Sequence, residues 1–171
     1  MNKYKLSEET LEIDGHVLHR IIALRDFGEV KKGDLGGFIE KESNLAHDWN
    51  CWIYNDAVVR GDAVVRGDAK VYGNAEVCGN AKVYGDAEVC GNAEVYGDAI
   101  VEKKSDYIVF KNWWSSGRYF TWTRSNDMWS DGCFYGTGEE LIKKAYKSSE
   151  EKGREYERIV RYVESIKSEI K

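Results

Sequence analysis

The sequence of 171 residues contains no proline and no run of 18 apolar residues. Without such a run we expect no helix that crosses a membrane. The first ten residues, MNKYKLSEET, also lack the apolar core of a signal peptide, which predicts a cytoplasmic protein. Cysteines in that compartment are usually free thiols, so the four cysteines need not pair. They are Cys51, Cys78, Cys90 and Cys133, no two with CxxC spacing, and no metal site is expected.

A basic excess is missing as well. The chain has 25 Lys and Arg against 30 Asp and Glu, a formal net charge of -5. Proteins that bind nucleic acids usually present a strongly basic face, so we do not expect this protein to bind DNA or RNA. A small anionic ligand remains compatible with the charge, because a few local Arg and Lys suffice to bind it.

What the chain does have is a repeat. Residues 55–102 are eight hexapeptides such as GDAVVR, GNAEVC and GNAEVY, and WNCWIY at 49–54 keeps their register. The Val position suits a buried strand, the small Ala suits a tight corner, and Gly followed by Asp or Asn tolerates positive φ at a turn. The pattern predicts a left-handed parallel β-helix with three repeats in each coil of about 18 residues. Neither an amphipathic helix nor a β-meander fits a period of six. Nine repeats give three coils, and the less regular stretch before them can supply a fourth.

In such a helix, residues 18 apart stack on one face. The first outward column is Tyr54, Tyr72 and Cys90, the second is Arg60, Cys78 and Tyr96, and the third is Arg66, Tyr84 and Glu102. Since Cys78 and Cys90 fall in different columns, a disulfide between them is not expected. The columns and their neighbours are rich in Tyr, Trp, Val and Ile, as interfaces are. We expect a homo-oligomer, most simply a trimer, with Tyr54, Tyr72, Tyr84 and Tyr96 at the interface.

The chain divides into three parts. Residues 1–48 are expected to form a cap, with a hairpin turn at Ile13–His16, and an irregular first coil; residues 49–102 form the repeat. Residues 103–171 form a Trp-rich α+β module, so the fold class is mainly β. Its expected strands run from Asp106 to Asn112, from Arg118 to Arg124 and from Met128 to Tyr135. Thr137 and Glu140 form a capping box for a first helix, and a second begins near Ser148 or Ser149.

Three segments resemble a known group of proteins. The run RIIALRDFGEVKKGDLGGFIEKESNLAHDWNCWIYNDA, the GDA and GNA hexapeptides and the tail GCFYGTGEEL resemble small hexapeptide-repeat proteins of phages and prophages. The resemblance covers most of the chain and implies the fold, trimeric assembly and a genomic setting, but no catalytic residue. Some phages encode oligomeric proteins that trap nucleotide signals of bacterial immune systems. By analogy of setting, the resemblance suggests a counter-defence sponge of that kind.

Two enzyme classes share the predicted solenoid. Hexapeptide acyltransferases place a His near a subunit interface as general base, whereas γ-type carbonic anhydrases need three His on zinc. The three histidines here are His16, His19 and His47, all before the regular repeats. No loop interrupts the coils between residues 55 and 102 either. The positions of the histidines argue against both enzymes. The uninterrupted coils argue against the acyltransferase, in which a loop often protrudes from a coil. Ordinary cap or surface roles suit these histidines.

Aromatic and basic residues gather in the C-terminal part and favour ligand binding. On a strand from Arg118 to Arg124, the alternate residues Arg118, Phe120, Trp122 and Arg124 face one way. An aromatic ring can stack on a base while Arg contacts phosphate oxygens. Further candidates for ligand contact are Lys111 and Trp113 nearby and Arg60, Arg66, Lys70 and Lys82 on the coils. The alternative is that this Trp-rich sheet packs on its own helices.

The sequence thus predicts a non-enzymatic protein, without cofactor, that sequesters a small phosphorylated or cyclic nucleotide. Substitution of Arg118 or Arg124 by Ala is expected to weaken binding without unfolding the chain. The alternatives left open are a hexapeptide-type acyltransferase and a structural trimerisation scaffold or virion component.

Overall fold

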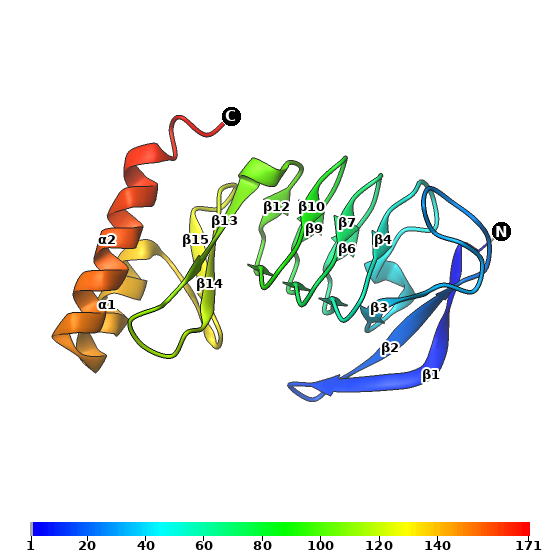
Figure 1. The fold of residues 1–171 in the computed structure, drawn as a ribbon, viewed down its shortest axis with the longest axis horizontal. Coiled ribbons are helices and arrows are strands. Elements are labelled where there is room, and N and C mark those ends of the chain that lie inside the picture. Colours follow the sequence, from blue (N-terminus) through cyan, green and yellow to red (C-terminus); the bar gives the residue numbers. More distant parts are fainter. Residues whose placement is uncertain (1) are drawn as a thin grey trace.

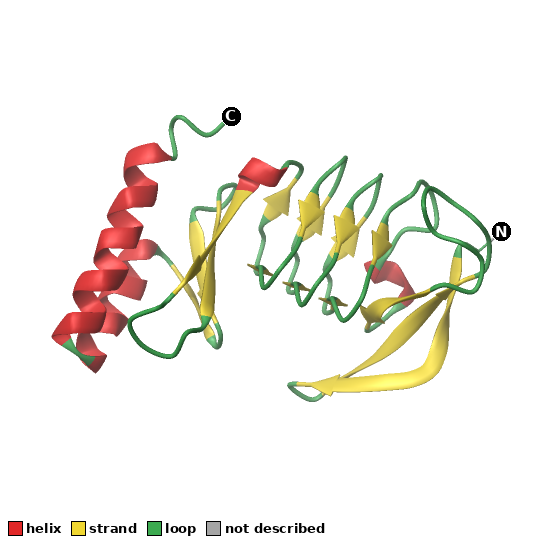
Figure 2. Ribbon diagram, viewed as in Figure 1, coloured by secondary structure: helices red, strands yellow, loops and turns green. Residues whose placement is uncertain are grey.

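The computed structural model describes residues 2–171 and consists of a β-solenoid with a different cap at each end (Figure 1). The N-terminal hairpin lies at one end of the solenoid, and a small sheet with two helices lies at the other (Figure 2). The solenoid has about four turns, which confirms the predicted fold class.

Nine two-residue strands, one in each hexapeptide, build the solenoid. They are β4 (Trp52–Ile53), β5 (Val58–Val59), β6 (Val64–Val65), β7 (Lys70–Val71), β8 (Glu76–Val77), β9 (Lys82–Val83), β10 (Glu88–Val89), β11 (Glu94–Val95) and β12 (Ile100–Val101). Strands three repeats apart pair in parallel, so that Val59 lies beside Val77 and Val77 beside Val95. This 18-residue spacing confirms three repeats per coil. Cys78 and Cys90 follow different strands, and all four cysteines are free thiols.

The inside of the solenoid contains the two apolar positions of each repeat. The repeat Val of every hexapeptide from Val59 to Val101 is fully buried, and so is the repeat Ala of every hexapeptide from Ala57 to Ala99. The corners need glycine for two reasons. Gly67 has φ 76, and a Cβ placed on it would lie 3.0 Å from the backbone N of Gly85 in the next coil. Asn55, with φ 56, takes the same place in the first regular repeat.

The N-terminal cap extends one wall of the solenoid. β1 (Tyr4–Ile13) and β2 (His16–Ala23) form the predicted hairpin, and β3 (Leu35–Ile39) pairs antiparallel with β2 and parallel with β5. The 3-10 helix η1 (Glu42–Asn44) follows, and Leu45 bridges to Val65, which completes the irregular first coil. Gly37 permits this stacking, because a Cβ there would collide with the carbonyl oxygen of Ala57.

The C-terminal module has its own hydrophobic core. After η2 (Lys104–Asp106), the antiparallel sheet contains β13 (Tyr107–Lys111), β14 (Tyr119–Thr123), β15 (Met128–Asp131) and β16 (Phe134–Gly136). The predicted strand from Met128 to Tyr135 is therefore wrong, because Gly132 at φ 56 turns the chain back into a hairpin. The helices α1 (Gly138–Ser148) and α2 (Glu150–Ile166) cover one sheet face, with N-caps at Thr137 and Ser149 as predicted. Neither is long and apolar enough to span a membrane, and the same holds for the rest of residues 2–171.

Side chains of the module complete the hydrogen bonding of the last coil. Within the solenoid, each coil donates backbone N–H groups to carbonyls of the next coil, as from Val58 to Ala75 at 2.9 Å. The last coil has no successor. The N–H of Glu94 instead donates to Thr121 Oγ1 at 2.9 Å, that of Ile100 to Ser125 Oγ at 2.7 Å, and that of Cys90 to Tyr107 Oη at 3.2 Å. The module is thus a cap that hides an open edge.

Candidate functional site

The structure disperses the residues that the sequence groups into one ligand face. Phe120 and Trp122 point together into the module core, 0% and 1% exposed, so neither ring is open to a base. The predicted packing of a Trp-rich sheet against its own helices describes them instead. Arg124 pairs with Asp106 at 3.4 Å. Lys111 lies over Tyr119, and Trp113 is 75% exposed.

The basic residues of the coils also have local partners. Arg60 bonds Glu76 at 2.7 Å and Asp14 at 3.1 Å, and Lys70 bonds Glu29 at 3.2 Å. Arg66 stacks over the Tyr84 ring, 3.9 Å from its centroid, and Lys82 is exposed. They lie on three different faces of the solenoid, so a single subunit does not bring them together.

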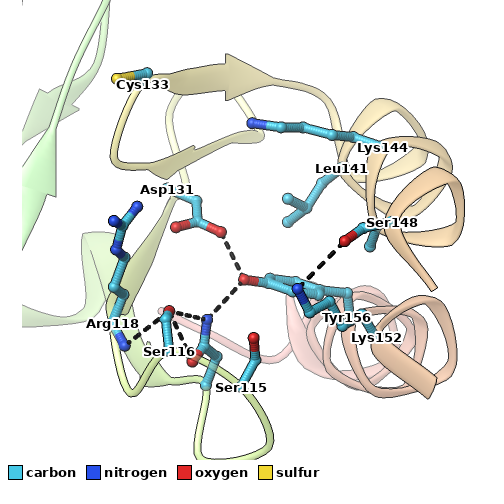
Figure 3. A pocket seen from close by; sticks show the side chains of 12 residues that line it. Ser115, Ser116, Arg118, Asp131, Cys133, Leu141, Lys144, Ser148, Lys152 and Tyr156 are labelled. Atoms are coloured by element: carbon cyan, nitrogen blue, oxygen red, sulfur yellow. Dashed lines mark hydrogen bonds between the residues drawn. The ribbon is translucent and has the colours of Figure 1, made fainter.

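Among the predicted binding residues, Lys70 lines a hollow on the solenoid beside Tyr54 and Tyr72, and Arg118 lines a pocket in the C-terminal module. We call it the sheet–helix pocket, because it lies between the sheet of the module and its two helices (Figure 3). Its volume is about 400 Å³, within the usual range for small-molecule sites. The lining consists of Asn112, Ser115, Ser116, Arg118, Asp131, Cys133, Leu141, Lys144, Ala145, Ser148, Lys152 and Tyr156.

A hydrogen-bonded network fixes the floor of the sheet–helix pocket. The Tyr156 hydroxyl donates to Asp131 Oδ2 at 2.6 Å and accepts from the Asn112 amide at 3.1 Å. Asn112 Oδ1 in turn accepts from the backbone N–H of Gly117 at 2.8 Å, which shapes the loop before Arg118. Burial and the hydrogen bond to Asp131 raise the pKa of Tyr156 well above its usual value, so it stays a neutral donor. Figure 3 shows this side chain reaching from α2 toward Asp131.

The charge of the sheet–helix pocket is positive. Arg118, Lys144 and Lys152 line it, and among residues 2–171 none of the three forms an ion pair. The Lys152 ammonium only donates to Ser148 Oγ at 3.2 Å, and that of Lys144 lies 4.9 Å from the Phe134 ring centre. The single carboxylate of the lining, Asp131, is already engaged by Tyr156. Three free cations beside serine hydroxyls are suited to bind a phosphate or another polyanion.

Arg118 also lines a second hollow, which we call the corner groove. It has a volume of about 370 Å³ and lies between the last two coils and the turn of the module. Its lining consists of Asn74, Glu76, Asn92, Glu94, Arg118, Tyr119 and Gly132. The Gly132 N–H donates to Glu94 Oε2 at 3.1 Å. Burial raises the pKa of Glu94 to about 7, and the neighbouring Glu76 and Asp131 add to the increase.

The three histidines lie apart in the N-terminal cap. His16 Nδ1 is 2.9 Å from the Glu40 carboxylate, and His19 Nδ1 is 3.1 Å from the Ser7 carbonyl. His47 stacks on Tyr4, with ring centres 4.4 Å apart. In the part of the chain from residue 2 to 171, no group of three His, Cys, Asp or Glu is arranged to hold a metal ion. Of the three, only His16 combines partial exposure with a carboxylate partner.

The sequence could not identify most of the pocket. Lys144 and Lys152 lie on α1 and α2, where charges at such spacing usually belong to a solvated face. Asp131 and Asn112 lie at strand ends, a position typical of polar residues that bind ligands. This position is the one feature of the sequence that could have indicated the pocket. Glu94 occupies the same repeat position as other glutamates. Only the turn at Gly132 distinguishes it.

Part of the chain is similar to a known protein. No family model matches the chain. Over 72 residues it is 43% identical to a protein of Escherichia coli strain K12 named "Uncharacterized acetyltransferase YdcK". The match covers 37% of this chain and 22% of that protein, so the chain spans about a fifth of the length of its relative.

Proposed function

We propose that the protein is an acyltransferase of the hexapeptide-repeat type that binds a phosphate-bearing acyl donor, such as a coenzyme A thioester, in the sheet–helix pocket. The observation that carries the proposal is the group of three unpaired cations, Arg118, Lys144 and Lys152, around a single pocket. The solenoid and the similarity to a protein named as an acetyltransferase favour acyl transfer among the reactions of phosphate-bearing donors.

Binding of the donor is tested through Arg118. Its replacement by Ala removes a charge-assisted hydrogen bond to phosphate, worth about 1.5–3 kcal/mol, so the dissociation constant should rise about 10- to 100-fold. Arg124→Ala is the matched control, because Arg124 lies outside the sheet–helix pocket and pairs with Asp106. Calorimetric titration with coenzyme A measures both variants. Equal affinity of wild type and Arg118→Ala would remove the pocket from the proposal.

Turnover is tested separately. Wild-type protein is mixed with acetyl-coenzyme A and a panel of small amines and alcohols, and release of the free thiol is followed. Thiol release that depends on one acceptor is the result expected of an acyltransferase. Binding of coenzyme A without thiol release for any acceptor would contradict acyl transfer.

The second candidate is stoichiometric sequestration of a small phosphorylated or cyclic nucleotide, including the role of a phage counter-defence sponge. The same three cations support it, but the burial of Phe120 and Trp122 leaves Tyr156 as the one aromatic residue of the lining. The pocket therefore offers more for a phosphate than for a base. Mass spectrometry of small molecules released by heating the purified protein tests sequestration, since a sponge retains a nucleotide and a scaffold retains none. The thiol-release assay tests acyl transfer.

A further inference from the structure

The corner groove lies directly beside the sheet–helix pocket. Arg118 lines both, and the turn at 131–133 contributes Asp131 and Cys133 to the pocket and Gly132 to the groove. A Cβ on Gly132 would lie 3.8 Å from Arg118 Nη1. The guanidinium and this turn therefore separate two adjoining compartments, one lined by cations and the other by carboxylates.

Within the corner groove, the two glutamates differ in their partners. Glu76 and Glu94 are directly paired on adjacent coils. Glu76 is held by Arg60 at 2.7 Å and by the Tyr96 hydroxyl at 3.0 Å. Glu94 is half-buried, and from residues 2–171 its carboxylate accepts only the backbone N–H of Gly132, on one oxygen. Its carboxyl is thus fixed in place while part of it stays free for a ligand.

We infer that the corner groove holds the acyl acceptor, a small molecule with a primary amine or hydroxyl group, and that the Glu94 carboxylate accepts its proton. The inference rests on the proposed acyl transfer. Asn74 and Asn92, stacked at the solenoid corner, and Tyr119 on the module offer further hydrogen bonds to such a molecule. A donor with its phosphates in the sheet–helix pocket reaches the groove past Arg118.

The acyl transfer needs no reagent other than the thioester and the acceptor. The acceptor nitrogen or oxygen forms a bond to the thioester carbonyl carbon and gives its proton to Glu94. The carbon–sulfur bond breaks, and the departing thiolate takes up that proton, so the products are an amide or ester and a free thiol. A general base works best when its pKa lies near the operating pH, and general bases contribute about 10²–10⁴ in rate.

The ionisation of Glu94 is set by groups on three sides. Burial raises its pKa most, and Glu76 from β8 and Asp131 from β15 act in the same direction. The Gly132 N–H and the Arg118 guanidinium, both from the module, lower it. Because the pKa of Glu94 is about 7, the population of the carboxylate form, which accepts a proton, increases as the pH rises from 6 to 8.

Glu94→Gln tests the inference, because the amide oxygen of Gln can still accept from Gly132. We expect kcat to fall about 100-fold with the donor dissociation constant unchanged. The wild-type kcat/KM should rise with pH to a plateau above about 7, and the variant should lose this rise. Glu88→Gln is the matched control, since Glu88 has the same repeat position on another face, where it pairs with Lys104. Its rate should equal that of the wild type.

The possible results distinguish a failure of the Glu94 role from a failure of acyl transfer itself. An active wild type whose rate survives Glu94→Gln overturns the role of Glu94 and leaves acyl transfer standing. A wild type that binds coenzyme A but never releases thiol overturns acyl transfer and the inference with it. As a readout independent of turnover, the free energy of unfolding should decrease as the pH rises from 4.5 through about 7, because the native state holds the Glu94 proton more tightly than the unfolded chain. Glu94→Gln should flatten that decrease.

Discussion

Tyr156 connects the stability of the C-terminal module with the shape of the sheet–helix pocket. Its ring is 6% exposed and packs in the module core, while its hydroxyl joins Asp131 and Asn112. The hydroxyl also donates a hydrogen bond to the Asp131 carboxylate, which would otherwise face an incoming phosphate. One side chain thereby contributes to folding and keeps the pocket favourable for an anion.

Tyr156→Phe removes this hydroxyl and keeps the ring. Asp131 then loses its donor, and the buried Asn112 amide loses one acceptor, so we expect a loss of about 1–3 kcal/mol in the free energy of unfolding. Urea denaturation measures this change. Tyr146→Phe is the control, because Tyr146 is 39% exposed and bonds Glu157 at the surface, where its loss should cost under about 0.5 kcal/mol. A Tyr156→Phe protein as stable as the wild type would show that the network does not stabilise the module.

Individual elements differ in how far the sequence determines them. The coils are predictable because each repeat position has one physical requirement, burial for Val, small volume for Ala or positive φ for Gly, and each is met by few residue types. The sequence also predicts that Phe120 and Trp122 lie on the same face of β14. It does not predict whether that face points to the core or to a ligand. Both faces of β14 are covered, one by the helices and one by the last coil, so alternation carries no information about exposure.

The cap on the last coil depends on contacts that no local pattern encodes. Thr121 and Glu94 are 27 residues apart, yet Thr121 Oγ1 accepts the N–H of Glu94. The same is true of Lys144 and Lys152, which meet Arg118 only after α1 and α2 fold onto the sheet. The sequence therefore predicts the existence of caps, since open ends require them, but not the residues that make them.

Thr121→Val tests this cap. Valine has nearly the shape of threonine, so the packing is kept while the buried N–H of Glu94 loses its acceptor, at a cost of about 1–3 kcal/mol in the free energy of unfolding. Because Thr121 is fully buried, water cannot replace the lost oxygen. Amide hydrogen exchange should accelerate in the last coil more than in the first. The same substitution at Thr10, exposed on the hairpin, should leave stability within about 0.5 kcal/mol. Unchanged exchange in the last coil would contradict the capping role.

At the scale of the whole molecule, the three faces of the solenoid are not equally covered. The first column is contacted by the loop after β2 through Glu29 and by Lys104, and the second by the hairpin tip through Asp14 and by Gly132. The third column, with Val64, Lys82 and Ile100 beside Arg66 and Tyr84, has no ion pair to either cap among residues 2–171. Ile100 is 39% exposed there, and the Arg66–Tyr84 stack is of a kind frequent at interfaces.

The third column is therefore the face through which we expect subunits to associate as a trimer. Ile100→Asp places a charge in that interface, where its desolvation without a partner is costly, so the native mass should change from three chains to one. Val17→Asp is the control, because Val17 is 51% exposed on the hairpin and lies outside the column. Native mass spectrometry measures the assembly, and circular dichroism checks that both variants keep their β-structure. The sheet–helix pocket lies in the C-terminal module, away from the third column, so the Ile100→Asp monomer should still bind coenzyme A. A wild type that is itself monomeric would contradict trimer formation and leave both compartments, each built within one chain, unaffected.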